Sequence, residues 1–133
     1  MEVFKIIVLS LSGLMMIYAG SSRLFKPLTS FCLKSYLDNP EFKLHGEVDA
    51  LNEMRAAGTS IAVGGLTILL STILPELRMT SFVVAVVIFL GHALGRLVSL
   101  KQDGKPGKLM TQGLTFDLGL GLLNALCLIT ILV

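Results

Sequence analysis

The sequence predicts an all-α fold, a four-transmembrane-helix antiparallel bundle with a short amphipathic interfacial helix in its first loop. The 133 residues are 53% hydrophobic and only 15% charged, with a mean hydropathy of +0.80. Soluble domains carry about 25% charged residues. The few charges leave four apolar stretches, each close to the roughly 20 residues that a helix needs to cross a bilayer. We therefore expect a single integral membrane domain over residues 1–133.

The expected spans are residues 4–22, 54–74, 79–100 and 109–132. Each mixes Gly, Ser or Thr with Leu, Ile and Val, which lets membrane helices pack closely. The first stretch also resembles a secretory signal, because Lys5 precedes an apolar run. Glu2 offsets that charge, so we expect a permanent helix.

The first loop, residues 23–53, is the longest segment between the spans. Its apolar side recurs at helical spacing through Leu24, Leu28, Phe31, Cys32 and Ser35. Pro27 suits a first helical turn, and Asp38-Asn39-Pro40 suits a turn that ends the helix. This pattern predicts a short amphipathic helix on the membrane surface.

The other two connections are short. Only Pro75-Glu76-Leu77-Arg78 separates the second and third spans, so these helices must be antiparallel neighbours. The third and fourth spans are joined by residues 101–108, where Asp103-Gly104-Lys105-Pro106-Gly107 favours a tight turn.

Lysine and arginine are unevenly distributed between the two ends of the predicted bundle. The first and third loops hold Arg23, Lys26, Lys34, Lys43, Lys101, Lys105 and Lys108. The opposite side holds only Lys5 and Arg78. The positive-inside rule therefore places both termini on the outer side of the membrane.

Several polar residues lie in or near the spans, where transferring a polar side chain into the bilayer costs free energy. We call the following set the polar cluster: Asn52, Glu53, Arg55, His92, Arg96, Ser99, Asp103, Asp117 and Asn124. The alternating helix directions put the charged members at one membrane face. Asp117 lies about 12 Å from its helix start, too deep for a short carboxylate to reach water. We expect it to face the bundle interior and to pair with Arg96 or Arg55.

Helical spacing groups these residues with small ones. The shared faces are His92, Arg96 and Ser99 in the third span, and Gly113, Asp117, Gly121 and Asn124 in the fourth. The small residues Gly58, Ala62 and Gly65, and the pair Gly91 and Gly95, predict close helix contacts around the polar groups.

Two interpretations of the cluster stay open. The charges of Glu53, Asp117, Arg55 and Arg96 sum to zero, as in a structural network that clamps three helices. We favour that interpretation over a site for a substrate, a proton or a lipid headgroup. His92 by itself is typical of an interhelical hydrogen bond.

The sequence predicts no metal, no cofactor and no nucleic-acid partner. Its two His and two Cys are far apart, and no Cys-x-x-Cys pair or phosphate-binding Gly loop is present. Cys32 and Cys127 give no disulfide pattern. There is no basic stripe with interleaved aromatic residues.

The chain resembles a family of small bacterial four-helix membrane proteins known as domain of unknown function 4345. The residues that carry this resemblance are Asn52-Glu53-x-Arg55, Gly58, Gly64-Gly65, Gly95-Arg96-x-x-Ser99, Asp103-Gly104-x-Pro106 and Asp117. The fourth-helix acid of the family is more typically Glu, and the first loop here is long. The resemblance implies a bacterial inner-membrane protein with its polar motifs at one face, and it supplies no activity.

Three functions therefore compete. The cluster could bind or transport a small charged substrate, an ion or a lipid headgroup, and transport would require a homo-oligomer because one protomer encloses little volume. The chain could instead be an accessory or assembly protein whose partner is another membrane protein. A membrane enzyme acting on a lipid or quinone would have His92 and Asp117 as its acid/base pair. Membrane lipids are expected neighbours in every case.

Overall fold

The computed structural model of the chain describes residues 1–27 and 48–133. Four long helices and one short 3₁₀ helix make up the described part. Their bounds are α1 Glu2–Phe25, α3 Val48–Leu70, η2 Pro75–Leu77, α4 Arg78–Gln102 and α5 Lys108–Leu132. The all-α prediction is confirmed. The predicted amphipathic helix falls on residues 28–47 and lies outside the described residues.

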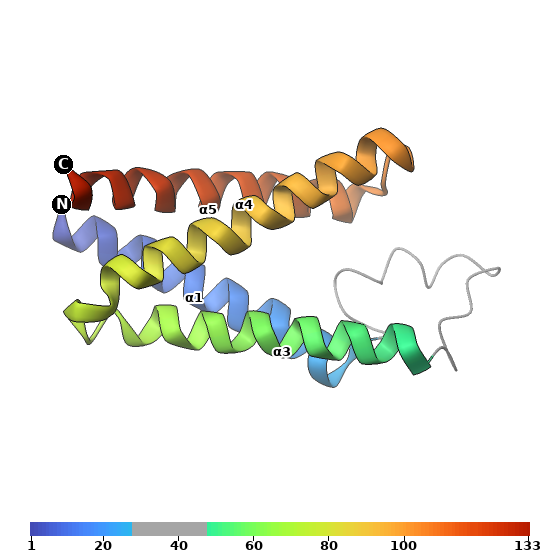
Figure 1. Cartoon of the computed structure of the whole chain (residues 1–133), viewed down its shortest axis with the longest axis horizontal. Coiled ribbons are helices and arrows are strands. Elements are labelled where there is room, and N and C mark those ends of the chain that lie inside the picture. The colour runs from blue at the N-terminus through green and yellow to red at the C-terminus, as the bar shows by residue number, and fades with distance from the viewer. Residues whose placement is uncertain (28–47) are drawn as a thin grey trace.

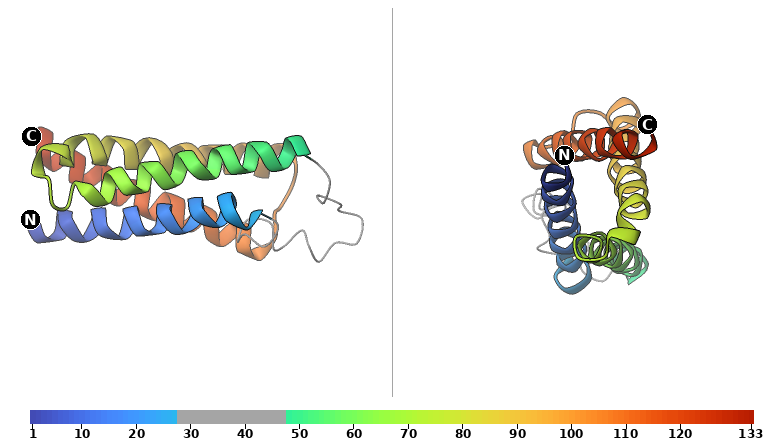
Figure 2. Two further views of the ribbon diagram at one scale, coloured as in Figure 1. Left: turned by 90° about the horizontal axis from the view of Figure 1, so that it is seen from below. Right: turned by 90° about the vertical axis from the view of Figure 1, so that its left-hand side faces the viewer.

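The long helices run alternately up and down, and both termini lie at one end of the bundle (Figure 1). We call that end the terminal end, and the opposite end, where α1 and α4 finish, the loop end. The most extensive packing joins α1 to α3 and α4 to α5. The end-on view shows the four helices around an open rectangle, with α1 and α3 on two adjoining sides and α4 and α5 on the other two (Figure 2).

Glycines bring α1 and α3 into backbone contact. A Cβ atom at Gly20 would lie 2.5 Å from the carbonyl oxygen of Gly58, and one at Gly65 would lie 2.8 Å from that of Gly13. Each helix therefore presents two glycines seven residues apart to the other, and no larger residue fits there. Gly58 and Gly65 were expected to pack closely, but their partner is α1 rather than the polar cluster.

The predicted close packing at Gly91 and Gly95 is wrong for the described part of the chain. A Cβ atom built at either glycine meets no described atom within 4 Å. The spacing of two glycines specifies a smooth helix surface but not which neighbour covers it.

The core lies between the two helix pairs. Leu9 of α1, Ile68 of α3 and Phe82 of α4 are fully buried, and Cys127 of α5 packs with them. At the terminal end, Arg78 binds Glu2 through Nη1 and Oε2 at 2.5 Å. These contacts close the terminal end and leave the loop end to the polar groups.

Three helical segments are long and apolar enough to cross a membrane: Glu2–Phe25, Pro75–Gln102 and Lys108–Leu132. The chain is therefore a membrane protein. The second predicted span, residues 54–74, is not among these segments. Helix α3 instead begins at Val48 and ends at Leu70, and its first turns carry Asp49, Glu53 and Arg55, which lower its mean hydropathy.

Candidate functional site

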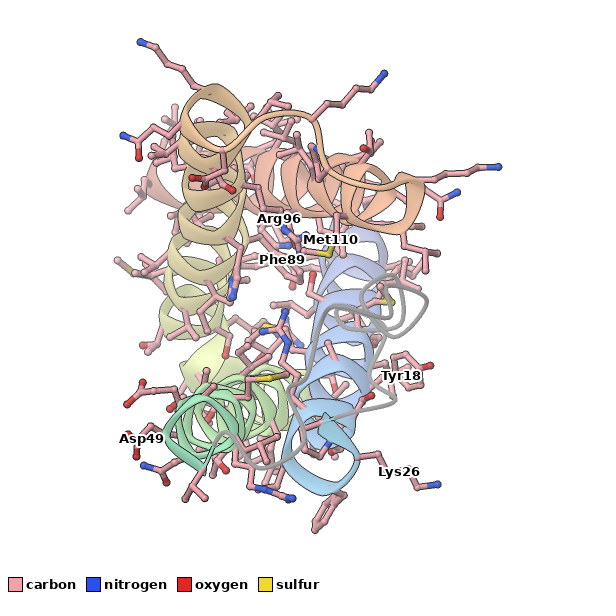
Figure 3. The ribbon with its side chains drawn as sticks, turned by 90° about the vertical axis from the view of Figure 1, so that its right-hand side faces the viewer. Tyr18, Lys26, Asp49, Phe89, Arg96 and Met110 are labelled. Carbon is pink, nitrogen blue, oxygen red and sulfur yellow. The ribbon has the colours of Figure 1, made fainter. Side chains whose placement is uncertain are left out.

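A cavity of about 170 Å³ lies between the two helix pairs. All four long helices contribute to its walls. The lining residues are Met15, Met16, Tyr18, Ala19, Ser22, Arg23, Ile61, Ile88, Phe89, His92, Arg96, Gly113, Phe116 and Asp117. Seen from the loop end, Arg96, Met110 and Phe89 lie inside the ring of helices (Figure 3). The deep part of the cavity is apolar, and its charged groups come from α1, α4 and α5.

Arg96 and Asp117 form an ion pair on one wall of the cavity. Nε of Arg96 donates to Oδ2 of Asp117 at 2.8 Å. The two side chains are 19% and 16% exposed. The sequence-based pairing of Asp117 with Arg96 is thus what the structure shows, and it ties α4 to α5.

The remaining contacts of Arg96 also come from α5. Its Nη1 lies 3.4 Å from the carbonyl oxygen of Met110 and 3.8 Å from Sδ of Met110. A Cβ atom at Gly113 would lie 2.9 Å from Nη1. Glycine at position 113 is therefore what allows the guanidinium to lie flat against α5.

His92 lines the same cavity one helical turn before Arg96. Its Nδ1 lies 2.8 Å from the carbonyl oxygen of Ile88. Because a carbonyl only accepts, Nδ1 carries the proton and donates, which leaves Nε2 as an acceptor in the neutral ring. His92 and Asp117 line one cavity, but each has a different hydrogen-bond partner, so the expected acid/base pair is not joined directly.

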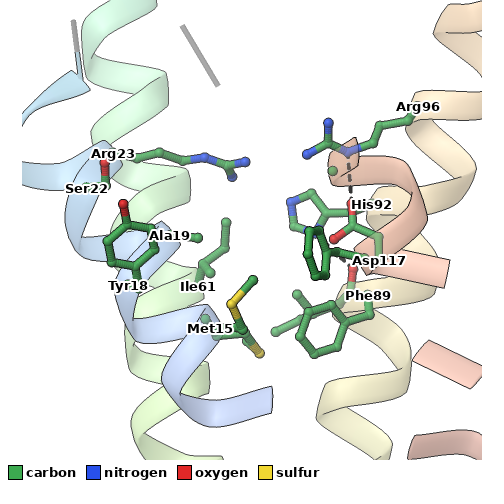
Figure 4. Close-up of a pocket in the computed structure, with 14 residues that line it drawn as sticks. Met15, Tyr18, Ala19, Ser22, Arg23, Ile61, Phe89, His92, Arg96 and Asp117 are labelled. Carbon is green, nitrogen blue, oxygen red and sulfur yellow. Dashed lines mark hydrogen bonds and ion pairs between the residues drawn. The ribbon is translucent and has the colours of Figure 1, made fainter. Parts of the chain in front are cut away.

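Arg23 is a charged cavity residue that sequence reasoning missed. It was counted as a loop residue because the uncharged stretch ends at Ser22, whereas α1 continues to Phe25. Arg23 and Arg96 point toward one another from opposite walls of the cavity (Figure 4). The available signal was the spacing of Met16, Ala19 and Arg23, which puts the three on one face of a continued helix.

Arg55 does not join Asp117. Its Nη1 donates to the carbonyl oxygen of Leu24, in the last turn of α1. Arg55 therefore caps α1 from the neighbouring helix, as basic groups near a helix C-terminus do. Asn52 and Glu53, in the same turns of α3, are exposed and are not among the described residues that line the cavity.

The other cluster members occupy two separate places. Ser99 donates to Oδ2 of Asp103 at 2.8 Å, at the exposed end of α4. Asn124 is fully buried nearer the terminal end, where its Nδ2 donates to Oγ of Ser12 at 2.7 Å and to the carbonyl oxygen of Leu120 at 2.8 Å. Asn124 thus joins α5 to α1, as a helix-joining amide is expected to do, and its Oδ1 has no hydrogen-bond partner among the described residues.

The charged groups on the cavity wall favour anions. The described lining residues include two guanidinium groups and one carboxylate, and the carboxylate is already engaged by Arg96. No set of three or more His, Cys, Asp or Glu side chains within residues 1–27 and 48–133 is grouped as a metal site. The chemistry that these walls offer is hydrogen bonding and charge attraction toward a negatively charged group.

Comparison with known proteins identifies the family. No curated protein and no solved structure matches the chain. The family model described as "Domain of unknown function (DUF4345)" matches residues 4–128, which include most of each of the four long helices and the residues that carry the resemblance noted above. The chain therefore belongs to the DUF4345 family.

Proposed function

We propose that the chain crosses the membrane four times and binds a negatively charged group in the cavity between its helix pairs, at the cytoplasmic face of a cell inner membrane. The observation that carries this proposal is the convergence of Arg23 and Arg96 on one cavity from opposite helix pairs. Arginine at a partly buried site favours carboxylate and phosphate, because its planar donors match their oxygens.

Arg96 keeps donor capacity for a ligand. A guanidinium carries five N–H groups, and Asp117 engages Nε of Arg96. Arg23 has an interaction of its own, but the same donor count allows it to hold that partner and still donate into the cavity. His92 adds an Nε2 atom that becomes a donor on protonation.

Two properties of helix α3 support a membrane crossing. Its 23 residues measure about 35 Å, enough for a hydrocarbon core of about 30 Å. Its glycines pack it directly along α1, which is long and apolar enough to cross the membrane. The polar first turns of α3 then lie at the loop end, beside Arg23 and the lysines that favour the cytoplasmic side.

The first experiment measures the thermal unfolding midpoint of the detergent-purified protein in the presence of each ion of a panel. Phosphate, glycerol phosphate and acetate should raise the unfolding midpoint, whereas choline and ammonium at the same ionic strength should not. In Asp117→Asn the midpoint without ligand should fall, and the anion-induced shift should persist or grow because a competing carboxylate is neutralised. A shift produced equally by anions and cations contradicts the proposal.

A second function, an accessory role with a structural polar cluster, is supported by a different observation. Arg96 ties α4 to α5 through Asp117, and Arg55 ties α3 to the end of α1. If the cluster only fastens helices, Arg96→Ala lowers stability and no anion changes the midpoint. Co-purification of one defined membrane protein with the wild type, lost in Arg96→Ala, would support that role.

A further inference from the structure

Two aromatic residues that line the cavity are also exposed on the outer surface of the helix bundle. Tyr18 of α1 and Phe116 of α5 both line the cavity, yet they are 67% and 55% exposed. Helices α1 and α5 join at Ser12 and Asn124, closer to the terminal end. These observations point to a lateral opening of the cavity between α1 and α5.

The depth of this opening matches the hydrocarbon region. Helix α5 has 25 residues, about 37 Å, so a centred core of about 30 Å begins about 4 Å inside each helix end. Phe116 lies about 12 Å from the start of α5, and Tyr18 about 10 Å from the end of α1. Both residues stand beside acyl chains rather than headgroups.

The guanidinium groups lie closer to the interface. Arg23 is about 3 Å from the end of α1, and Arg96 about 9 Å from the end of α4. Both long side chains can extend toward the headgroup level. Cationic groups near the interface thus stand above apolar walls, which include Met15, Phe89 and Phe116.

The guanidinium level also has room for a headgroup. A shallower hollow of about 590 Å³ adjoins the cavity and shares Arg23, His92 and Arg96 with it. Its wall continues along α4 over Gly91 and Gly95, where a Cβ atom would meet no described atom within 4 Å. Space at the charged level and an apolar slot below it fit an amphiphile better than a small free ion.

We infer that the anion is the phosphate group of an anionic membrane lipid, which enters sideways between α1 and α5 and lays its hydrocarbon chain against the apolar walls. This inference rests on the proposed anion site and adds the source of the anion. Burial of each methylene group then adds to binding, which a free phosphate cannot gain.

The first test is a chain-length series on the wild-type protein. Binding of methyl, butyl and octyl phosphate is measured by isothermal titration in one detergent, with an octyl trimethylammonium salt as the control for partition into the micelle. Affinity should rise about tenfold or more from methyl to octyl phosphate. Equal affinities for the three phosphates would overturn the lipid inference and leave the anion site standing, whereas no binding of any phosphate would overturn both.

A steric variant tests the lateral opening. Ala19 lines the cavity beside Tyr18, and Ala57 is exposed on α3 outside the described lining. Ala19→Phe should lower octyl phosphate binding about tenfold more than it lowers methyl phosphate binding. Ala57→Phe should change neither. Equal loss of binding of both phosphates in a folded Ala19→Phe protein, or loss of neither, contradicts the route between α1 and α5.

Native mass spectrometry then distinguishes lipids that share their acyl chains. Phosphatidylglycerol should remain bound to the wild type about tenfold more than phosphatidylcholine, whose choline group cancels the phosphate charge. In Arg23→Gln that preference should disappear, whereas Lys26→Gln, which removes an exposed charge at the same end, should keep it. Equal retention of the two lipids by the wild type contradicts the inference.

Discussion

Nε of Arg96 lies 2.8 Å from Oδ2 of Asp117, so one contact joins α4 to α5 and sets a guanidinium on the cavity wall. The same arginine therefore serves stability and the proposed site. An ion pair at 19% and 16% exposure is costly to break, because the remaining charge stays largely buried.

Removing Arg96 alone should destabilise the protein more than removing both partners. Arg96→Met leaves the Asp117 carboxylate unpaired and should cost about 2 kcal/mol or more. The double variant Arg96→Met/Asp117→Leu should recover part of that loss. Denaturant titration in detergent measures both, with Ser99→Ala at the exposed end of α4 as the control. A cost for Arg96→Met no larger than for Ser99→Ala would show that the pair contributes little.

Two glycines should respond in opposite ways to the same substitution. Gly58→Ala places a Cβ atom 2.7 Å from the carbonyl oxygen of Gly20 and should cost about 1–3 kcal/mol by forcing α1 from α3. Gly91→Ala meets open space within the described structure and should be neutral or stabilising by up to about 1 kcal/mol. Thermal midpoints of the two variants give the comparison. Equal losses at both positions would contradict the described α1–α3 packing.

The buried hydrogen bond between Asn124 and Ser12 should contribute only modestly to the free energy of unfolding. Interhelical hydrogen bonds in membranes average about 0.6 kcal/mol and reach about 1.7 kcal/mol. A double-mutant cycle of Asn124→Ala and Ser12→Ala should give a coupling energy in that range. Zero coupling would mean that the two helices are held by packing alone.

The topology should be visible from two engineered cysteines. In a background of Cys32→Ser and Cys127→Ala, Glu76→Cys should react with an impermeant reagent outside intact cells, because four crossings put residue 76 on the outer side. Lys105→Cys should react only after the cells are opened. Labelling of both cysteines from the same side would show that α4 does not cross.

The helices were predictable because their signal is distributed over many residues. The long uncharged stretches of the sequence predicted the ends of α1, α4 and α5 to within about three residues. The predicted bounds of helix α3 lay too far toward the C-terminus. A polar helical turn cannot be distinguished from a loop by the positions of charged residues alone. The first turns of α3 also contact α1 through Arg55 and Leu24, a contact that charge spacing does not show.

Site residues were predictable from the sequence only where the free-energy cost of a charge inside a membrane span singled them out. Asp117 and Arg96 stood out because a charge inside a span must find a partner. Arg23 did not stand out, because a charge at the end of an apolar run is ordinary. The sequence of one helix does not specify which other helix packs against each of its faces. The partner of Arg55 and the open surface at Gly91 and Gly95 therefore could not be predicted from residue spacing.

The most direct test of the anion site is the binding of glycerol phosphate to three proteins by isothermal titration in one detergent. The wild type should bind one anion per protomer. Arg23→Gln should weaken binding about tenfold or more, as expected for loss of a charge-assisted contact. Lys26→Gln, three residues along the same end of α1, should bind like the wild type. An equal loss of affinity in the two variants would show that glycerol phosphate responds only to the general surface charge. No binding to the wild type would contradict the anion site itself.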